Sequence, residues 1–182
     1  MRRKKFFIIN CILLFSLVLL YKAFEYILRL NNLRFLNYIN ITVAAIFTIL
    51  LFSILIQIII FLYNITCKSD TKTHTRIICR LGIFFIVLSI GIYIFIGFIF
   101  YAFTEPEHIV EKDGKKMVAS VESFLQVRVG YYDYINPFIR GNRIRIYEDY
   151  GNGGYDPFEQ REVLIPKHYS YYDDNGNIIK SN

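Results

Sequence analysis

Three long apolar runs followed by a polar segment of different composition form the main pattern of this chain. The runs, at residues 6–24, 41–63 and 81–103, carry almost no charge. A helix needs roughly 20 apolar residues to cross about 30 Å of hydrocarbon. Runs of this length without polar alternation favour helices over strands, although they are rich in Ile and Phe. The sequence therefore predicts three transmembrane helices.

The first run needs separate consideration, because a basic start followed by an apolar stretch also resembles a secretory signal peptide. Four basic residues precede the run: Arg2, Arg3, Lys4 and Lys5. The exit from the run, at residues 21–26, reads Tyr-Lys-Ala-Phe-Glu-Tyr and lacks the small residues of a cleavage site. We therefore expect this segment to stay in the protein as its first membrane helix.

From residue 104 to residue 182 the chain becomes charged, rich in tyrosine and interrupted by Gly and Pro. Two short motifs, Asp113-Gly114 and Asn175-Gly176, provide the positive φ values that tight hairpin turns require. Residues on either side of both motifs favour strands. The expected fold class is three transmembrane helices followed by a small, mainly antiparallel β domain, with the domain boundary after residue 103.

Strands of this domain are expected where β-branched or aromatic residues form short runs or alternate with polar ones. The expected segments are residues 108–112, 115–121, 127–131, 143–147, 163–165, 169–172 and 178–180. Residues 147–159 contain three glycines and a proline, which predicts a loop. Oxygen-bearing side chains in this loop do not follow the spacing of an EF-hand calcium site. We therefore expect no bound metal and no cofactor.

Positive charge is concentrated beside the apolar runs. The whole chain has a formal net charge of +6, yet residues 104–182 hold ten Lys/Arg against thirteen Asp/Glu. A nucleic-acid binder concentrates positive charge on its soluble part. The sequence therefore predicts the lipid bilayer as one partner and no nucleic acid.

The basic residues also indicate an orientation, because Lys and Arg are enriched on the cytoplasmic side of membrane proteins. Eight lie at the N-terminus or between the second and third runs: Arg2, Arg3, Lys4, Lys5, Lys68, Lys72, Arg76 and Arg80. Six lie between the first two runs or just after the third: Lys22, Arg29, Arg34, Lys112, Lys115 and Lys116. We expect a plasma-membrane protein with its N-terminus in the cytoplasm and its C-terminal domain outside.

The interiors of the runs are nearly free of ionisable side chains. Pumps and proton-coupled transporters need buried acids or bases to relay charge, so a transport function is disfavoured. Gln57 lies deep within the second run, and we expect it to hydrogen-bond a neighbouring helix rather than to line a pathway.

Nine of the fifteen tyrosines lie after residue 104. Tyrosine is favoured in strands and also in binding surfaces, where it gives rigid amphipathic contact area. One hypothesis is that most of them pack the core of the domain. The other is a tyrosine-lined surface that binds a partner or a glycan, with these candidates: Tyr131, Tyr132, Tyr134, Tyr147, Tyr150 and Tyr155.

The sequence offers no nucleophile–base pair or metal constellation, so we expect that the protein is not an enzyme. The favoured function is display of the extracytoplasmic domain, which would interact with another envelope protein or with the cell wall. The alternative is a small membrane immunity protein, or an accessory or regulatory subunit, that acts through its helices.

Overall fold

The computed structural model describes residues 2–68, 70–160 and 164–182. The chain folds into two compact units, and we call them the helical unit and the β unit. The helical unit comprises Met1–Tyr21 and Thr42–Ala102, and the β unit comprises Lys22–Ile41 and Phe103–Asn182. Residues 22–41, which join the first two apolar runs, therefore fold together with the C-terminal segment, a feature that the sequence did not indicate.

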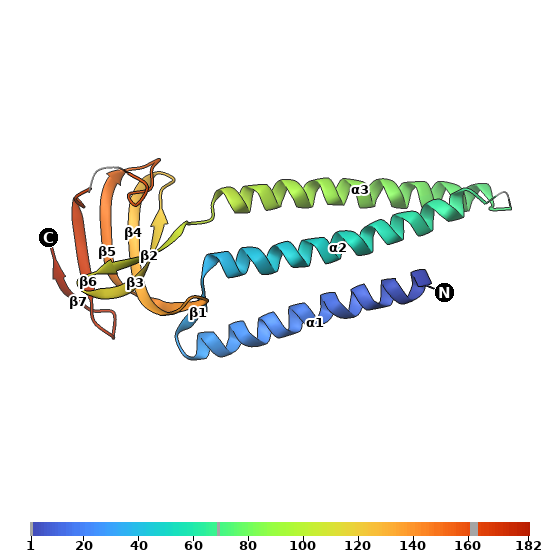
Figure 1. The fold of residues 1–182 in the computed structure, drawn as a ribbon. Helices are drawn as coiled ribbons and strands as arrows, with labels where there is room; N and C mark the ends of the chain where they lie inside the picture. The colour runs from blue at the N-terminus through green and yellow to red at the C-terminus, as the bar shows by residue number, and fades with distance from the viewer. Residues whose placement is uncertain (1, 69, 161–163) are drawn as a thin grey trace. The chain divides into compact units, whose positions relative to one another are not determined.

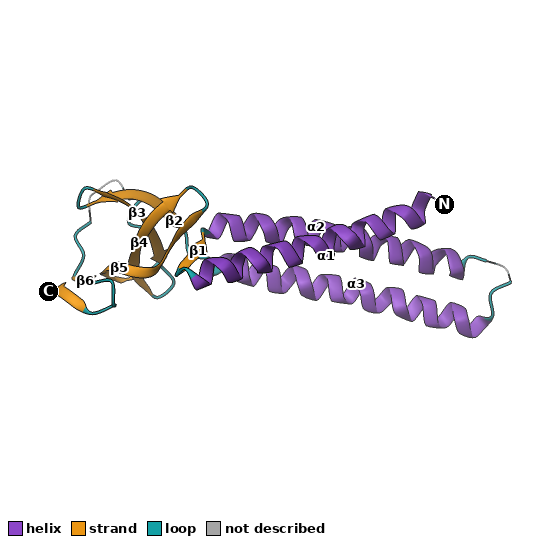
Figure 2. Ribbon diagram, turned by 90° about the horizontal axis from the view of Figure 1, so that it is seen from below, coloured by secondary structure: helices purple, strands orange, loops and turns teal. Residues whose placement is uncertain are grey.

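Three long helices account for the apolar runs: α1 (Arg2–Leu30), α2 (Asn37–Thr66) and α3 (Thr73–Ala102). Within the helical unit they lie side by side and alternate in direction (Figures 1 and 2). All three are long and apolar enough to cross a membrane. Most of their large apolar side chains are exposed. Apolar surface of this extent is costly to expose to water, so the helices are compatible with a multi-pass membrane protein.

Hydrogen bonds between polar side chains connect α2 with both of the other helices. Asn10 of α1 is buried and donates its side-chain amide to Ser53 Oγ of α2, at 2.8 Å. Thr48 of α2 shares a hydrogen bond of 3.0 Å with the Tyr93 hydroxyl of α3. Gln57 instead donates to the backbone carbonyl of Ser53 in its own helix, at 3.0 Å. Asn10, rather than Gln57, thus provides the hydrogen bond between α1 and α2.

The β unit contains one antiparallel sheet (Figures 1 and 2). Its strand order is β2-β3-β4-β5-β6-β7, and β1 pairs separately with β5. The strands are β1 (Leu33–Phe35), β2 (Glu107–Lys112), β3 (Lys115–Glu122), β4 (Gln126–Asn136), β5 (Ile139–Asn152), β6 (His168–Tyr172) and β7 (Ile178–Ser181). Three apolar helices followed by an antiparallel sheet confirm the coarse fold expected from the sequence.

Both predicted hairpins are present, and local turn chemistry explains them. β2 and β3 are joined through Asp113 and Gly114, whose φ angles are 52° and 72°. β6 and β7 are joined by a longer turn, in which the Asp173 carboxylate accepts the backbone N–H groups of Asn175 and Asn177, both at 2.8 Å. Gly176 in this turn has a φ of 85°. Positive φ angles are sterically costly for most residues but not for glycine, which has no Cβ atom.

Two expectations for the middle of the sheet are wrong. The predicted loop at residues 147–159 starts later, because β5 continues to Asn152 and pairs with both β4 and β6. The apolar residues Leu164 and Ile165 belong to no strand, and Val163 of the same expected strand lies outside the described residues. In both cases the outcome depends on pairing with distant strands, which local composition does not report.

β1 is a short strand in the connection between α1 and α2. It pairs with the start of β5, with Leu33 opposite Gly141 and Phe35 opposite Ile139. The backbone N–H of Leu36 extends this pairing by donating to Phe138 O at 3.0 Å, and the Leu36 side chain is buried. The connection between the first two helices therefore contributes both a strand and a core residue to the β unit.

The core of the β unit is small and lies on one face of the sheet. Six buried residues from three strands form it: Met117, Ala119, Val121, Val129, Tyr131 and Ile146. β3 is unusual because Val118 and Ser120, which point to the opposite face, are buried as well. Side chains therefore cover the sheet on both faces at β3.

The glycine-rich segment after β5 has a packing role. Gly153 and Gly154 donate their backbone N–H groups to the carbonyl oxygens of Leu125 and Ser123, at 2.9 and 2.8 Å. A Cβ atom on Gly153 would lie 2.8 Å from Leu125 C and from Ser123 O. Both contacts involve backbone atoms, which cannot rotate away, so the close approach of the two loops requires glycine.

We predict that Gly153→Ala lowers the free energy of unfolding of the β unit by about 1–3 kcal/mol, the usual cost of forcing extra atoms into a packed site. Chemical denaturation of the full-length protein in detergent, followed through tyrosine fluorescence, measures the change. The control is Asn152→Ala, because the Asn152 side chain is exposed and its loss should change stability by no more than about 0.5 kcal/mol. Equal stabilities of the two variants would contradict the packing role.

Candidate functional site

The six candidate tyrosines do not form one continuous surface. Tyr131 is buried in the core of the β unit, and Tyr150 packs against that core. Tyr155 lies in the loop after β5 and is half-buried. The hypothesis that tyrosines pack the core therefore describes Tyr131 and Tyr150, while the remaining candidates stay available for contact with a partner.

Tyr132 and Tyr147 lie on the opposite face of the sheet, on either side of Gly130. Gly130 is paired with Tyr147 across β4 and β5. A Cβ atom on Gly130 would lie 3.2 Å from the ring of Tyr132, so this ring covers the glycine. Tyr134 follows on the same strand, with the Lys116 ammonium 4.4 Å from its ring centroid. Three of the six candidates thus remain half-exposed on β4 and β5.

A buried carboxylate, Glu148, lies at the centre of the core face. Its Oε2 atom accepts the hydroxyl groups of Tyr131 at 2.6 Å and Tyr150 at 2.9 Å. Its Oε1 atom forms an ion pair with Lys112 Nζ at 2.6 Å. Both oxygens are thereby occupied by donors, which offsets the cost of burying the charge. The three donors stabilise the buried charge of Glu148.

The same cluster changes the acidity of its tyrosines. Burial, and secondly the hydrogen bond to Glu148, raises the pKa of Tyr131 far above its usual value. Burial and the charge of Glu148 raise the pKa of Tyr150 in the same way. Burial and a hydrogen bond of 2.9 Å to Asp113 raise the pKa of Tyr171 to about 12. All three phenols therefore remain protonated at neutral pH.

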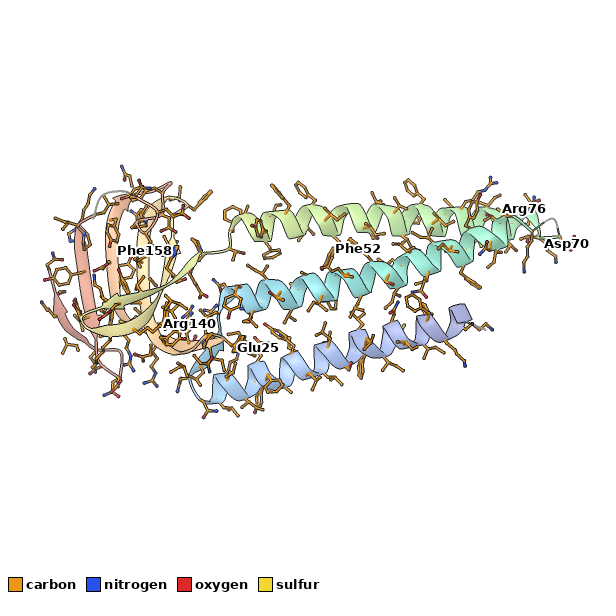
Figure 3. The ribbon with its side chains drawn as sticks, viewed as in Figure 1. Glu25, Phe52, Asp70, Arg76, Arg140 and Phe158 are labelled. Atoms are coloured by element: carbon orange, nitrogen blue, oxygen red, sulfur yellow. The ribbon has the colours of Figure 1, made fainter. Side chains whose placement is uncertain are left out.

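A second group lies at the edge of the core, where the loop after β5 meets β2. His108 Nε2 is 2.7 Å from Asp156 Oδ2, and the His108 ring stacks on Phe158 with a centroid distance of 5.0 Å. Phe158, marked in Figure 3, also makes an edge contact with Tyr131. Among the described residues, no group of three His, Cys, Asp or Glu side chains is placed to hold a metal ion. The contacts fasten the loop to the core.

The opposite face holds a second buried ion pair, between Glu107 of β2 and Arg140 of β5. Arg140 Nε lies 2.8 Å from Glu107 Oε1, and both side chains are almost completely buried. The other carboxylate oxygen accepts the backbone N–H of Asn37, the first residue of α2, at 2.6 Å. The Arg140 guanidinium also stacks 3.6 Å from the ring centroid of Tyr132 (Figure 3 marks Arg140). This cluster joins β2, β5 and the start of α2.

Neither charged cluster was singled out in the sequence. One signal for Glu148 existed, because it occupies the position between Ile146 and Tyr150 in the two-residue period of β5, where an inward side chain is expected. No comparable signal existed for Glu107 and Arg140, which are 33 residues apart in the chain. Their partnership arises from the fold.

Comparison of the chain with protein-family models, with curated proteins and with solved structures gives no match. Evidence for a function therefore comes from the sequence and structure of this chain.

We predict that Tyr131→Phe lowers the free energy of unfolding by about 1.5–3 kcal/mol, because it removes a hydrogen bond to a buried charged group. Tyr147→Phe is the matched control, since the Tyr147 ring lies on the opposite face, and its change should stay within about 0.5 kcal/mol. Urea titration of both full-length variants in detergent at pH 7 provides the measurement. Equal losses in the two variants would argue against the Glu148 cluster as a stabilising centre.

The same pair of variants should differ in their response to alkaline pH. Folded Tyr131 holds its proton more tightly than the unfolded chain, so its contribution is fully present below about pH 10, the usual tyrosine pKa. Stability should fall as the pH rises above this value, and Tyr131→Phe should flatten that fall. Melting temperatures between pH 8 and pH 11 test this; an unchanged slope in Tyr131→Phe would contradict it.

Proposed function

We propose that this chain is a multi-pass protein of the plasma membrane that displays its β unit outside the cell, where the unit binds an envelope protein or the cell wall. The observation that carries the proposal is the contrast between the two units. The helices expose apolar side chains along their length, while the β unit has its own core and, in residues 104–182, ten Lys/Arg and thirteen Asp/Glu. Such a division suits an anchor and a displayed domain.

The proposed orientation rests on charge and on helix direction. Because α1, α2 and α3 alternate in direction within the helical unit, the N-terminus and the connection between α2 and α3 lie at one end of it (Figure 1). That end carries the larger group of basic residues identified in the sequence, including Lys68 and Lys72. Positive charge favours the cytoplasmic side, so the β unit follows on the outside.

We propose the half-exposed tyrosines on β4 and β5 as the binding surface. Tyr132, Tyr134 and Tyr147 offer aromatic area on the face opposite the core, and two of them have cationic neighbours. Tyrosine is enriched in protein interfaces because its ring packs while its hydroxyl group remains available for a hydrogen bond.

The orientation predicts the pattern of cysteine labelling in intact cells. Cys67 at the end of α2 should resist an impermeant maleimide, because it lies on the cytoplasmic side, whereas Ser181→Cys in β7 should react. Permeabilised cells provide the control, because Cys67 is exposed in the structure and should then label. Labelling of Cys67 but not of position 181 in intact cells would reverse the proposed orientation.

The display function predicts where a partner can be cross-linked. A photoreactive phenylalanine at Tyr147 should capture an envelope component in living cells. The same group at Phe95, an exposed residue of α3, should capture no protein. The accessory-subunit alternative predicts the opposite result, with a protein partner captured from Phe95 and none from Tyr147.

A further inference from the structure

Two hairpin tips of the β unit expose large apolar side chains where turns ordinarily carry polar ones. The first tip joins β3 and β4, and there Phe124 and Leu125 are 69% and 77% exposed. The second tip joins β4 and β5 and exposes Phe138, and Ile135 near the end of β4 is exposed beside it. Apolar side chains at turns are costly in water and call for a specific apolar partner.

The first tip contacts a residue that borders an apolar helix. The ring of Phe124 packs edge-on against the ring of Phe103, with the centroids 5.0 Å apart. Phe103 directly follows Ala102, the last residue of α3, so their Cα atoms are only about 3.8 Å apart. The contact itself lies within the β unit, to which both Phe103 and Phe124 belong.

The second tip contacts the beginning of α2. The hydroxyl group of Tyr38, in the first turn of α2, donates to the carbonyl oxygen of Pro137. The N–H of Leu36, just before α2, donates to Phe138 O at 3.0 Å. Both contacts lie within the β unit, and they place Phe138 next to the end of α2 that begins this apolar helix.

Both tips are held in position by hydrogen bonds. In the first, Gly153 and Gly154 bind the carbonyl oxygens that flank Phe124. In the second, the Asn136 side-chain oxygen accepts the N–H groups of Phe138 at 2.8 Å and Ile139 at 2.9 Å. The exposed rings are therefore presented by defined turns.

We propose that the two tips insert into the interfacial region of the bilayer leaflet at which α2 begins and α3 ends, so that lipid covers Phe124, Leu125, Ile135 and Phe138. This inference rests on the proposed function, in which the helices span a bilayer. α2 and α3 each contain 30 residues. At about 1.5 Å per residue each is about 45 Å long, which matches a bilayer of about 40–45 Å that includes both interfacial regions.

The choice of lipid as the occupant follows from this length. The ends of α2 and α3 then lie in the interfacial region, where aromatic side chains are favoured. Phe124 packs on Phe103, which follows α3, and Phe138 O accepts the N–H of Leu36, which precedes α2, so the proposal gives both tips this depth. Ile165 and Ile179 are as exposed, at 86% and 70%, but no described contact joins either to a helix end. The inference therefore assigns lipid to the two tips and water to Ile179.

Depth-dependent fluorescence quenching tests the inference on the full-length chain. After replacement of the three native cysteines by alanine, an environment-sensitive NBD probe is attached at Phe124→Cys, at Phe138→Cys or at Ile179→Cys. Leu125→Cys and Ile135→Cys serve as second variants for the two tips. The protein is reconstituted into vesicles of phosphatidylcholine and phosphatidylglycerol, with and without a nitroxide-labelled lipid whose label lies near the headgroups.

Probes at both tips should emit at shorter wavelength and lose at least half of their intensity to the nitroxide lipid. The probe at position 179 should be quenched by aqueous iodide and hardly by the nitroxide lipid. Lipid quenching at the tips no greater than at position 179 would overturn the inference. Tips shielded from both quenchers would also overturn it, because they would then be covered by protein.

A further probe at Ile94→Cys, in α3, separates this inference from the proposed function. Quenching of position 94 by a nitroxide deep in the acyl chains, together with water-exposed tips, would reject the insertion of the tips and leave the membrane anchor intact. An unquenched position 94 would overturn both.

Discussion

The buried ion pair between Glu107 and Arg140 is the interaction on which the organisation of the β unit depends. It connects β2, the first strand after α3, with β5, the strand that pairs with β1. Through the Asn37 N–H it also fixes the start of α2. The first N–H groups of a helix have no partner within the helix and carry partial positive charge. A carboxylate placed there satisfies one of these donors and the guanidinium together. Loss of either charged side chain would leave the other buried and uncompensated, which typically costs about 3–5 kcal/mol.

The second buried ion pair, between Lys112 and Glu148 on the core face, helps to hold the sheet in a curled form around a core of few residues. Lys112 of β2 and Glu148 of β5 are not on neighbouring strands, since β3 and β4 lie between them in the sheet. Their contact at 2.6 Å therefore requires the sheet to curl over its own core. Register shifts in the pairing of β4 with β5 allow such a curl, because a bulge bends a strand and increases its twist. Charge pairs on both faces thus complement an apolar core of few residues.

Local features of the sequence predicted the parts of this fold that local chemistry determines. The length of the apolar runs predicted the three helices, and the Asp-Gly and Asn-Gly pairs predicted the two hairpins. β1 escaped prediction because three residues with a central Arg34 form a strand only through a partner about 100 residues away. The tyrosines were not divided between the two faces, because the expected strands at residues 127–131 and 143–147 stop short of Tyr132, Tyr134 and Tyr150, which β4 and β5 include. Buried charges such as Arg140 also escaped, since only the fold supplies their partners.

Because residues 22–41 belong to the β unit, a domain boundary after residue 103 would leave part of that unit behind. A segment that begins at residue 104 would lack β1 and the buried side chain of Leu36, and Glu107 would lose its bond to Asn37. Such a segment has only 79 residues, so its stability would be small even before these losses. The β unit is therefore built from two separate pieces of chain, Lys22–Ile41 and Phe103–Asn182. Because β1 pairs with the start of β5 and Leu36 N–H bonds to Phe138 O, the connection between α1 and α2 completes the hydrogen bonding of that edge of the sheet, and the same connection leads directly into the start of α2.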